Sequence, residues 1–139
     1  MQSNGVKLFL RAAISLSFLS AVADRLGIWG ANYSVWGNWQ NFIAYTRLIN
    51  PWLPEATIEP VGIVATAAEV VFALCLIAGY KTEMFAKLSG FLLLIFALSM
   101  TFSTGIKGVF DYSVFTASAG AFALSLMKNK FFEVDNIIN

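Results

Sequence analysis

The chain has no histidine, a single cysteine (Cys75) and few charges, since Lys, Arg, Asp and Glu together make up 12% of its 139 residues. Haem ligation by histidine, a zinc site, an iron–sulfur cluster and an intramolecular disulfide therefore lack ligands or partners within this chain. We expect no metal site, and any redox chemistry would need a bound organic cofactor or another subunit. The formal net charge is +1, without a basic face or run, so nucleic acid is not an expected partner.

What the chain has in abundance is apolar residues, which make up 58% of the sequence. Soluble domains carry about 25% charged residues, so this composition is typical of a membrane protein. Four segments are apolar enough for membrane helices, each about 30 Å long at ~1.5 Å per residue: residues 8–29, 61–80, 85–104 and 109–127. The sequence predicts an all-α fold, a single transmembrane domain over residues 1–139 that forms an antiparallel four-helix bundle in the lipid bilayer.

The first of these segments has an alternative interpretation. A basic start with Lys7 and Arg11, an apolar run and the small triplet Ala21-Val22-Ala23 also resemble a cleavable signal peptide. We expect the segment to be retained as a helix, with Arg11 as a cationic anchor at the cytoplasmic boundary.

The distribution of Lys and Arg predicts the orientation. Six of them fall on one side of a four-helix layout and three on the other: Lys7, Arg11, Lys81, Lys87, Lys128 and Lys130 against Arg25, Arg47 and Lys107. Both termini are therefore expected to be cytoplasmic, with residues 128–139 as a frayed cytoplasmic tail. The expected location is the cytoplasmic (inner) membrane of a prokaryote.

The connection over residues 30–60 is then expected on the outer face, where its aromatic residues suit the membrane interface. Trp36, Trp39 and Trp52 are predicted interfacial anchors. Asn38 is a candidate cap for a short amphipathic helix over residues 39–49, which Pro51 ends. We expect this segment to lie in the headgroup plane, either as a lid over the bundle or as an ordinary aromatic anchor.

Glu69 is the most informative residue, because it stands near the middle of the otherwise uncharged segment 61–80. A carboxylate at the bilayer centre costs on the order of 2.5 kcal/mol or more, so it is expected to face the protein interior and to pair with another group. Stripes of small residues at spacings of three or four mark packing faces in membranes. By this criterion Glu69 and Arg25 both point inward.

Estimated depths gather the charged and hydroxyl side chains in the outer half of the bundle. The candidate polar cluster consists of Asp24, Arg25, Thr66, Glu69, Ser99, Ser103, Lys107 and Asp111. Two interpretations are open. The first is a buried Arg25–Glu69 ion pair that fixes helix register, and the second is a polar pocket, open toward the outer leaflet, that receives a small polar or amphipathic ligand.

Several short motifs resemble the DoxX family of small four-helix membrane proteins, which includes the DoxD-type subunit of thiosulfate:quinone oxidoreductase. They are Arg11-Ala-Ala-Ile at the start of the first helix, Asp24-Arg25-Leu26 near its end, the Trp-rich outer segment up to Pro51 and Pro60, and Ala68-Glu69-Val70-Val71-Phe72. The resemblance implies a membrane subunit linked to redox or quinone metabolism, with Glu69 and Arg25 at a site for a quinone or lipid-like ligand.

The predicted function is thus a DoxX-like integral membrane subunit of a redox-related complex. No self-contained catalytic motif is present, and no covalently bound cofactor is expected. The alternatives are a non-catalytic scaffold that recruits partner proteins and a small proton-coupled transporter. A homo-oligomer or a complex with other proteins is expected in each case.

Overall fold

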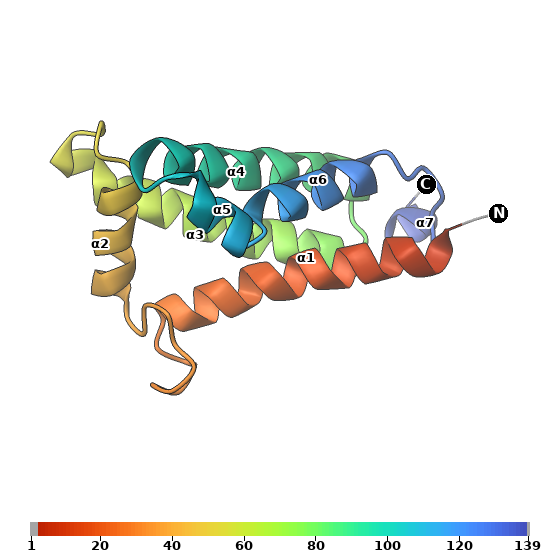
Figure 1. The fold of residues 1–139 in the computed structure, drawn as a ribbon. Helices are drawn as coiled ribbons and strands as arrows, with labels where there is room; N and C mark the ends of the chain where they lie inside the picture. The colour runs from red at the N-terminus through yellow and green to blue at the C-terminus, as the bar shows by residue number, and fades with distance from the viewer. Residues whose placement is uncertain (1–2, 139) are drawn as a thin grey trace.

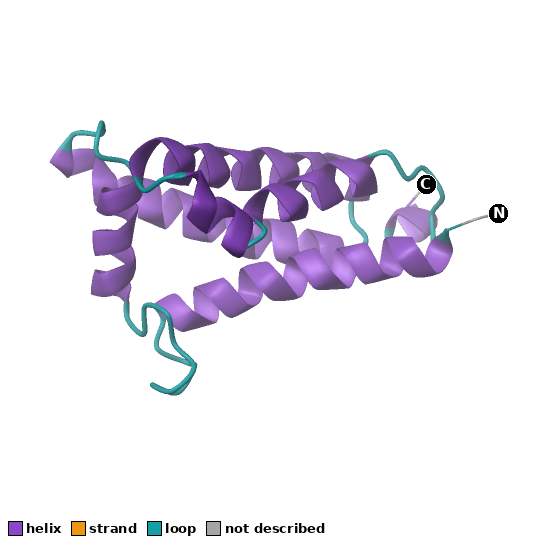
Figure 2. Cartoon of the chain, viewed as in Figure 1, coloured by secondary structure: helices purple, strands orange, loops and turns teal. Residues whose placement is uncertain are grey.

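The computed structural model describes residues 3–138, and all regular secondary structure in that range is helical (Figures 1 and 2). The helices are α1 (Asn4–Arg25), α2 (Trp39–Ile49), α3 (Glu55–Ala78), α4 (Thr82–Ser103), α5 (Ile106–Asp111), α6 (Val114–Ser125) and α7 (Asp135–Ile138). Among the described residues, α1, α3 and α4 are long and apolar enough to cross a membrane. The all-α prediction is confirmed.

Local signals explain where these helices begin and end. The Asn38 side chain accepts a hydrogen bond of 2.8 Å from the Asn41 amide and caps α2, as predicted. Gly79 ends α3 in the left-handed conformation, with φ at +71°, and the Tyr80 amide donates to the Cys75 carbonyl in a Schellman-type cap. The boundaries differ from the predictions mainly at α1, which ends at Arg25, and at α3, which begins six residues before position 61.

The fourth predicted helix, over residues 109–127, is not continuous in the structure. It is divided into α5 and α6 by Tyr112 and Ser113, and Ser113 adopts a left-handed conformation with φ at +55°. The sequence prediction of one uninterrupted span was wrong here. No proline or glycine stands at the break, so composition and hydropathy alone do not reveal it.

The long helices pack through small residues. Gly90 on α4 lies against the Phe122 ring of α6, where an added Cβ would come within 2.9 Å of ring carbons. The Ser118 hydroxyl donates a hydrogen bond of 2.8 Å to the Gly90 carbonyl in the same interface. A core of Ile14, Phe18, Ala73, Leu76, Ala86, Ala121 and Leu124 joins α1, α3, α4 and α6. Close approach of backbones at small residues is the usual packing mode of membrane helices.

Helix α2 crosses the end of the molecule opposite the start of α1 (Figure 1). It rests on α3 at Gly62, where an added Cβ would meet the Ile43 side chain at 2.6 Å and Phe42 at 3.3 Å. Its buried side chains are Phe42, Thr46 and Ile49. Leu48 of the same helix is exposed.

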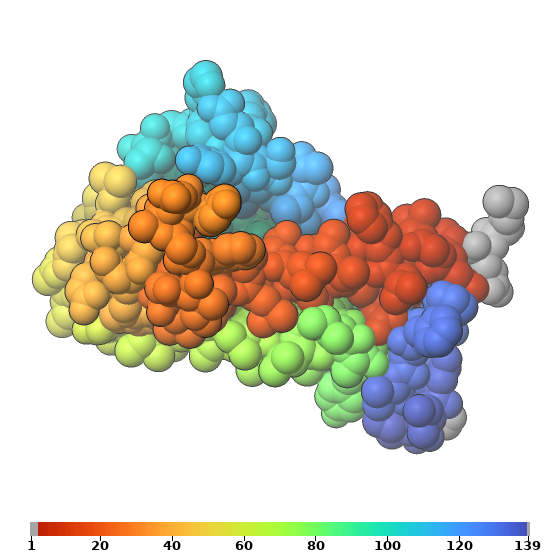
Figure 3. All heavy atoms as spheres, turned by 90° about the horizontal axis from the view of Figure 1, so that it is seen from below, coloured from red at the N-terminus to blue at the C-terminus, as the bar shows by residue number. Residues whose placement is uncertain are grey.

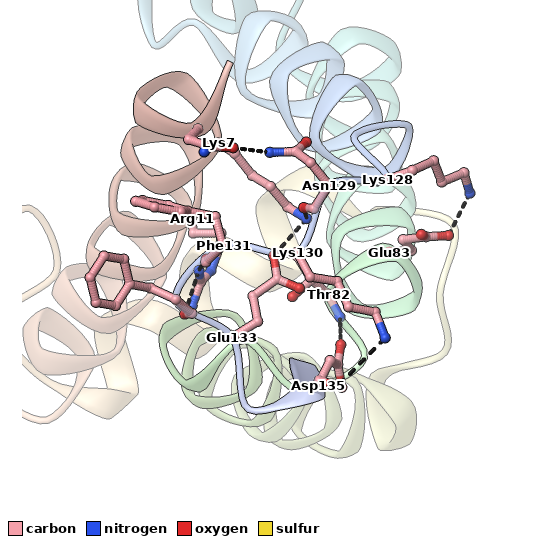
Figure 4. Close-up of polar contacts among 12 residues, drawn as sticks. Lys7, Arg11, Thr82, Glu83, Lys128, Asn129, Lys130, Phe131, Glu133 and Asp135 are labelled. Carbon is pink, nitrogen blue, oxygen red and sulfur yellow. Dashed lines mark hydrogen bonds and ion pairs between the residues drawn. The ribbon is translucent and has the colours of Figure 1, made fainter. Parts of the chain in front are cut away.

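Residues 128–138 do not form a frayed tail in the structure, and residue 139 lies outside the described residues. The segment folds back across the end of the bundle where α1 begins and α3 ends (Figure 4). The Val134 and Asp135 amides donate hydrogen bonds to the carbonyls of Ala78 and Gly79, and the Asp135 carboxylate accepts from the amides of Lys81 and Thr82 at the start of α4. Its polar groups bind helix termini, which explains how a polar segment becomes ordered.

The sequence predicted that Arg11 anchors the chain at the lipid boundary. In the structure Arg11 instead binds the folded segment. Its side chain is 2% exposed, and its guanidinium donates four hydrogen bonds of 2.8–2.9 Å. The acceptors are the carbonyls of Leu76 and Ile77 on α3 and of Phe131 and Phe132 in the folded segment. Arginine suits this position because its fork of donors can satisfy several carbonyls at once.

Candidate functional site

A cavity of about 1140 Å³ lies in the half of the molecule covered by α2. Its walls come from α1, α3, α4, α6 and the loop after α1, and α2 closes one end. In the space-filling view, the surface is hollowed between α1 and the α5–α6 segment, and α4 is visible at the bottom of the hollow (Figure 3). The cavity is therefore open sideways, toward the surface that lipid would contact.

Two stripes of small residues form opposite walls of this opening. Ala13, Ser17 and Ala21 line it on α1, while Thr116, Ala117 and Gly120 line it on α6. The walls converge at Leu10 and Gly120, where an added Cβ on Gly120 would be 3.6 Å from the Leu10 side chain. Small residues at spacings of three or four usually mark close packing of membrane helices. Here the small side chains instead leave volume between α1 and α6.

The polar end of the cavity is built on Arg25 and Glu69, both 2% exposed. Arg25 Nη2 donates a hydrogen bond of 3.1 Å to Glu69 Oε1, and Nη1 lies 2.5 Å from Oε2. Nη1 also donates to the Thr66 hydroxyl at 2.8 Å, and Thr66 in turn donates to the Gly62 carbonyl. The structure thus brings together three of the side chains that the sequence singled out.

Aromatic rings cover the guanidinium from the side of α2. The Arg25 Cζ lies 3.9 Å from the centroid of the Phe42 ring and 5.3 Å from that of Trp36. A cation over a ring face gains about 0.5–2 kcal/mol, more when water is excluded. These rings help to retain a charged pair in an apolar environment, where the pair alone would return little net stability.

The pair leaves two buried polar atoms without a hydrogen bond. They are Arg25 Nε and Glu69 Oε2, because the contact of Oε2 with Nη1 lacks hydrogen-bond geometry. One is a donor and the other an acceptor. Glu69 Oε2 is nevertheless held in ion-pair contact with the guanidinium, and both atoms are buried away from the cavity surface. Contacts with a ligand are therefore left to the neutral polar side chains of the lining.

Asp24 precedes Arg25 in the chain, but its carboxylate binds the loop between α1 and α2. Its carboxylate accepts hydrogen bonds from the amides of Val35 (2.9 Å), Trp36 (3.3 Å) and Gly37 (2.9 Å). Gly37 has φ at +78°, a conformation that glycine adopts without strain. Asp24 therefore fixes the loop that carries Trp36 to the cavity wall.

Tyr45 of helix α2 and Asn50, the residue that follows the helix, also line the cavity. Burial raises the pKa of the Tyr45 hydroxyl, which therefore stays protonated and able to donate a hydrogen bond at physiological pH. Asn50 donates to the Thr46 carbonyl at 2.9 Å and accepts from the Ser99 hydroxyl at 3.0 Å. Ser99 thus ties α4 to the end of α2.

Other residues of the predicted cluster lie elsewhere. Ser103 donates to the Ser99 carbonyl within α4, and Lys107 and Asp111 form an exposed pair 2.6 Å apart on α5. Among the predicted anchors, Trp39 donates to Glu59 at the surface, and Trp52 is 53% exposed. None of these five residues lines the cavity.

Sequence reasoning missed several residues of the site. Tyr45 and Asn50 lie in a segment that was interpreted only as an interfacial helix. The Asn50-Pro51 pair, which favours the start of a turn, was the one local signal at this end of the helix. Leu93, Phe96 and Met100 of α4 also line the cavity. They carry no signal in the sequence, because apolar residues on a membrane helix suit lipid, protein and cavity equally.

The fold and composition define an all-helical protein with three helices, within residues 3–138, that are suited to a membrane. No protein-family model, no curated protein and no solved structure matches the chain. The resemblance to the DoxX family thus stays a prediction that rests on the motifs alone.

Proposed function

We propose that the chain is an integral membrane protein that binds an amphipathic molecule of the quinone type in this cavity, as a DoxX-like subunit of a redox-related complex. The observation that carries the proposal is the form of the cavity, an apolar body with a buried Arg25–Glu69 pair at one end. Such a site suits a molecule with a polar head and an apolar chain.

The volume supports a ligand of this size. Pockets for drug-sized molecules measure about 300–1000 Å³, and the cavity, at about 1140 Å³, has room for a ring and part of a chain. The head would lie beneath α2, near Trp36 and Phe42, and the chain would follow the small residues of α1 and α6. The sideways opening allows entry from the lipid.

The membrane topology belongs to the same proposal. Helices α1, α3 and α4 each cross the bilayer, and α5 with α6 forms the fourth span of an antiparallel bundle, interrupted at Ser113. Both termini are cytoplasmic in a prokaryotic inner membrane, following the distribution of Lys and Arg. The starts of α1 and α7 do lie at the same end of the molecule (Figure 1), which this topology requires.

The residues that would hold a quinone fit its chemistry. The Tyr45 hydroxyl on the cavity wall can donate to a carbonyl oxygen, and the Arg25–Glu69 pair makes this end of the cavity polar. A bound quinone would supply two-electron chemistry that this chain's side chains lack. The chain would orient the head group, exclude water from it through α2 and keep a carboxylate within reach of its proton. Electron donors and acceptors would be partner subunits.

Native mass spectrometry of the protein extracted in mild detergent tests the proposal. We expect a bound quinone or similar amphiphile that is lost in Glu69→Gln and retained in Asp111→Asn, a matched change of an exposed carboxylate outside the cavity. Ligand content that is the same in all three proteins, with a lower melting temperature for Glu69→Gln alone, would make the pair a structural element. Co-purifying proteins without any small molecule would indicate a scaffold instead.

One observation favours a transporter as the second candidate. The break between α5 and α6 is at the cavity wall, where Ser113 is a lining residue. Interrupted helices are common at the substrate sites of transporters. Proton-coupled flux into proteoliposomes that depends on Glu69 would support this function over that of a redox subunit.

A further inference from the structure

The cavity carries three charged side chains among its described lining residues, namely Asp24, Arg25 and Glu69. The other polar residues of the lining are neutral Ser, Thr, Tyr and Asn side chains. One cation therefore stands against two carboxylates, and the formal charge of the lining is negative.

The single cation is already paired. Glu69 lies 2.5 Å from Arg25, and both side chains are almost fully buried. Asp24 has its own partners in three loop amides, which are dipoles and carry no compensating charge. An anionic head group would thus meet no free cation, because the Glu69 carboxylate opposes the attraction of the Arg25 guanidinium. The unbalanced charge of the lining is that of Asp24, and it repels an anion.

A cationic head group is not favoured either. Both Glu69 oxygens lie in the field of the Arg25 guanidinium, and the loop amides occupy the Asp24 carboxylate. The remaining opportunities are uncharged, namely the protonated hydroxyl of Tyr45 and the Ser and Thr hydroxyls of the lining. A carbonyl, ester or hydroxyl group can bind to these atoms without a charge of its own.

We infer that the cavity selects amphiphiles with an uncharged, hydrogen-bonding head group and rejects free fatty acids and anionic lipids of the same chain length. This inference rests on the proposed function, since it assigns the head-group class to the same ligand site. The Arg25–Glu69 pair thereby acts as a charge filter in addition to its structural role, because each partner removes the attraction of the other for an ion.

The experiment compares methyl dodecanoate, dodecanoate and dodecylammonium, which share one chain and differ in head-group charge. Each is added to the protein in phosphatidylcholine nanodiscs, and bound molecules are counted by native mass spectrometry after release. We expect an affinity for the ester at least roughly tenfold above that for either ion. Equal or tighter binding of dodecanoate or of dodecylammonium would overturn the inference.

Two variants make the test specific. Glu69→Gln frees the Arg25 charge and is expected to raise dodecanoate binding about tenfold or more over the unchanged protein. Thr116→Lys adds a cation at an exposed position of the cavity wall and is expected to do the same. Thr116→Met is its control for size. If Thr116→Lys folds and gains no dodecanoate, charge does not govern selection and the inference fails.

The outcomes also separate this inference from the proposed function. In one outcome a quinone with a decyl chain binds in the same nanodiscs, and dodecanoate binds as tightly as the ester. This result would support the proposed quinone binding and overturn the selection by head-group charge. Tighter binding of the ester than of either ion, without quinone binding, would support selection by head-group charge and overturn the quinone assignment. Absence of binding by every probe would overturn both.

Discussion

Lys7 and Glu133, 126 positions apart in the chain, form a buried ion pair in which Nζ lies 2.6 Å from Oε1 and both side chains are 2% exposed. The pair joins the first helix to the segment after α6 at the base of the bundle (Figure 4). Lys7 also donates a hydrogen bond to the Asn129 carbonyl. A segment that hydropathy assigns to solvent is therefore part of the folded core.

Breaking this pair is expected to destabilise the protein strongly. Glu133→Ala leaves the Lys7 ammonium buried without its counter-charge, which typically costs about 3–5 kcal/mol. Thermal unfolding followed by circular dichroism in nanodiscs measures the effect. Lys128→Ala, which removes an exposed pair with Glu83, is the control and is expected to change stability by less than about 1 kcal/mol. Equal melting temperatures for the two variants would contradict a structural role for the folded segment.

The α4–α6 contact gives a second prediction. In Gly90→Ala the new Cβ would lie within 2.9 Å of the Phe122 ring, so the ring or the two helices must shift. Overpacking of this kind costs about 1–3 kcal/mol. In the control, Gly120→Ala, the nearest atom outside its own helix is 3.6 Å away, an ordinary contact.

Thermal unfolding of the two glycine variants under identical conditions checks this prediction. We expect Gly90→Ala to unfold at a lower temperature than Gly120→Ala. Truncation of the ring in Gly90→Ala/Phe122→Leu is expected to recover part of the loss, since it removes the clash. If the double variant unfolds at a still lower temperature than Gly90→Ala, the contact with the Phe122 ring does not set the distance between α4 and α6.

Tyr45 gives a prediction about alkaline pH. Burial raises the pKa of its hydroxyl above the value near 10 of an exposed tyrosine. Between the unfolded and folded pKa values the folded state holds more protons, so this group's contribution to stability is lost as pH rises above about 10. Melting temperatures of the protein and of Tyr45→Phe, measured from pH 8 upward, should diverge there, with the variant losing less. Tyr33→Phe removes a 79% exposed hydroxyl and should follow the unchanged protein.

The parts of the fold that local chemistry dictates could be predicted from the sequence. Asn38 and Pro51 delimit α2 because a capping side chain and a ring without an amide act within one turn. The inward placement of Glu69 followed from the cost of a carboxylate in lipid. The same argument directed attention to Arg25, whose depth on α1 lies within reach of Glu69.

The parts that depend on distant contacts could not be predicted. Arg11 was predicted to be a boundary anchor, because the sequence around it does not indicate the four carbonyl acceptors, which come from α3 and the folded segment. Ser113 interrupts a run that is uniformly apolar on either side. Small residues on α1 and α6 indicate a close contact or an opening equally well, and only the placement of both helices decides between them.

The position of the Arg11 hydrogen bonds has a mechanical consequence for the cavity. They fix α1 near its first turns, whereas the hollow beside α6 lies toward the far end of a helix that is about 30 Å long. At the far end of the same helix, Arg25 binds Glu69 and Thr66 of α3. Helix α1 is thus attached to α3 at both ends of the cavity, and loosening either attachment would change the width of the opening beside α6.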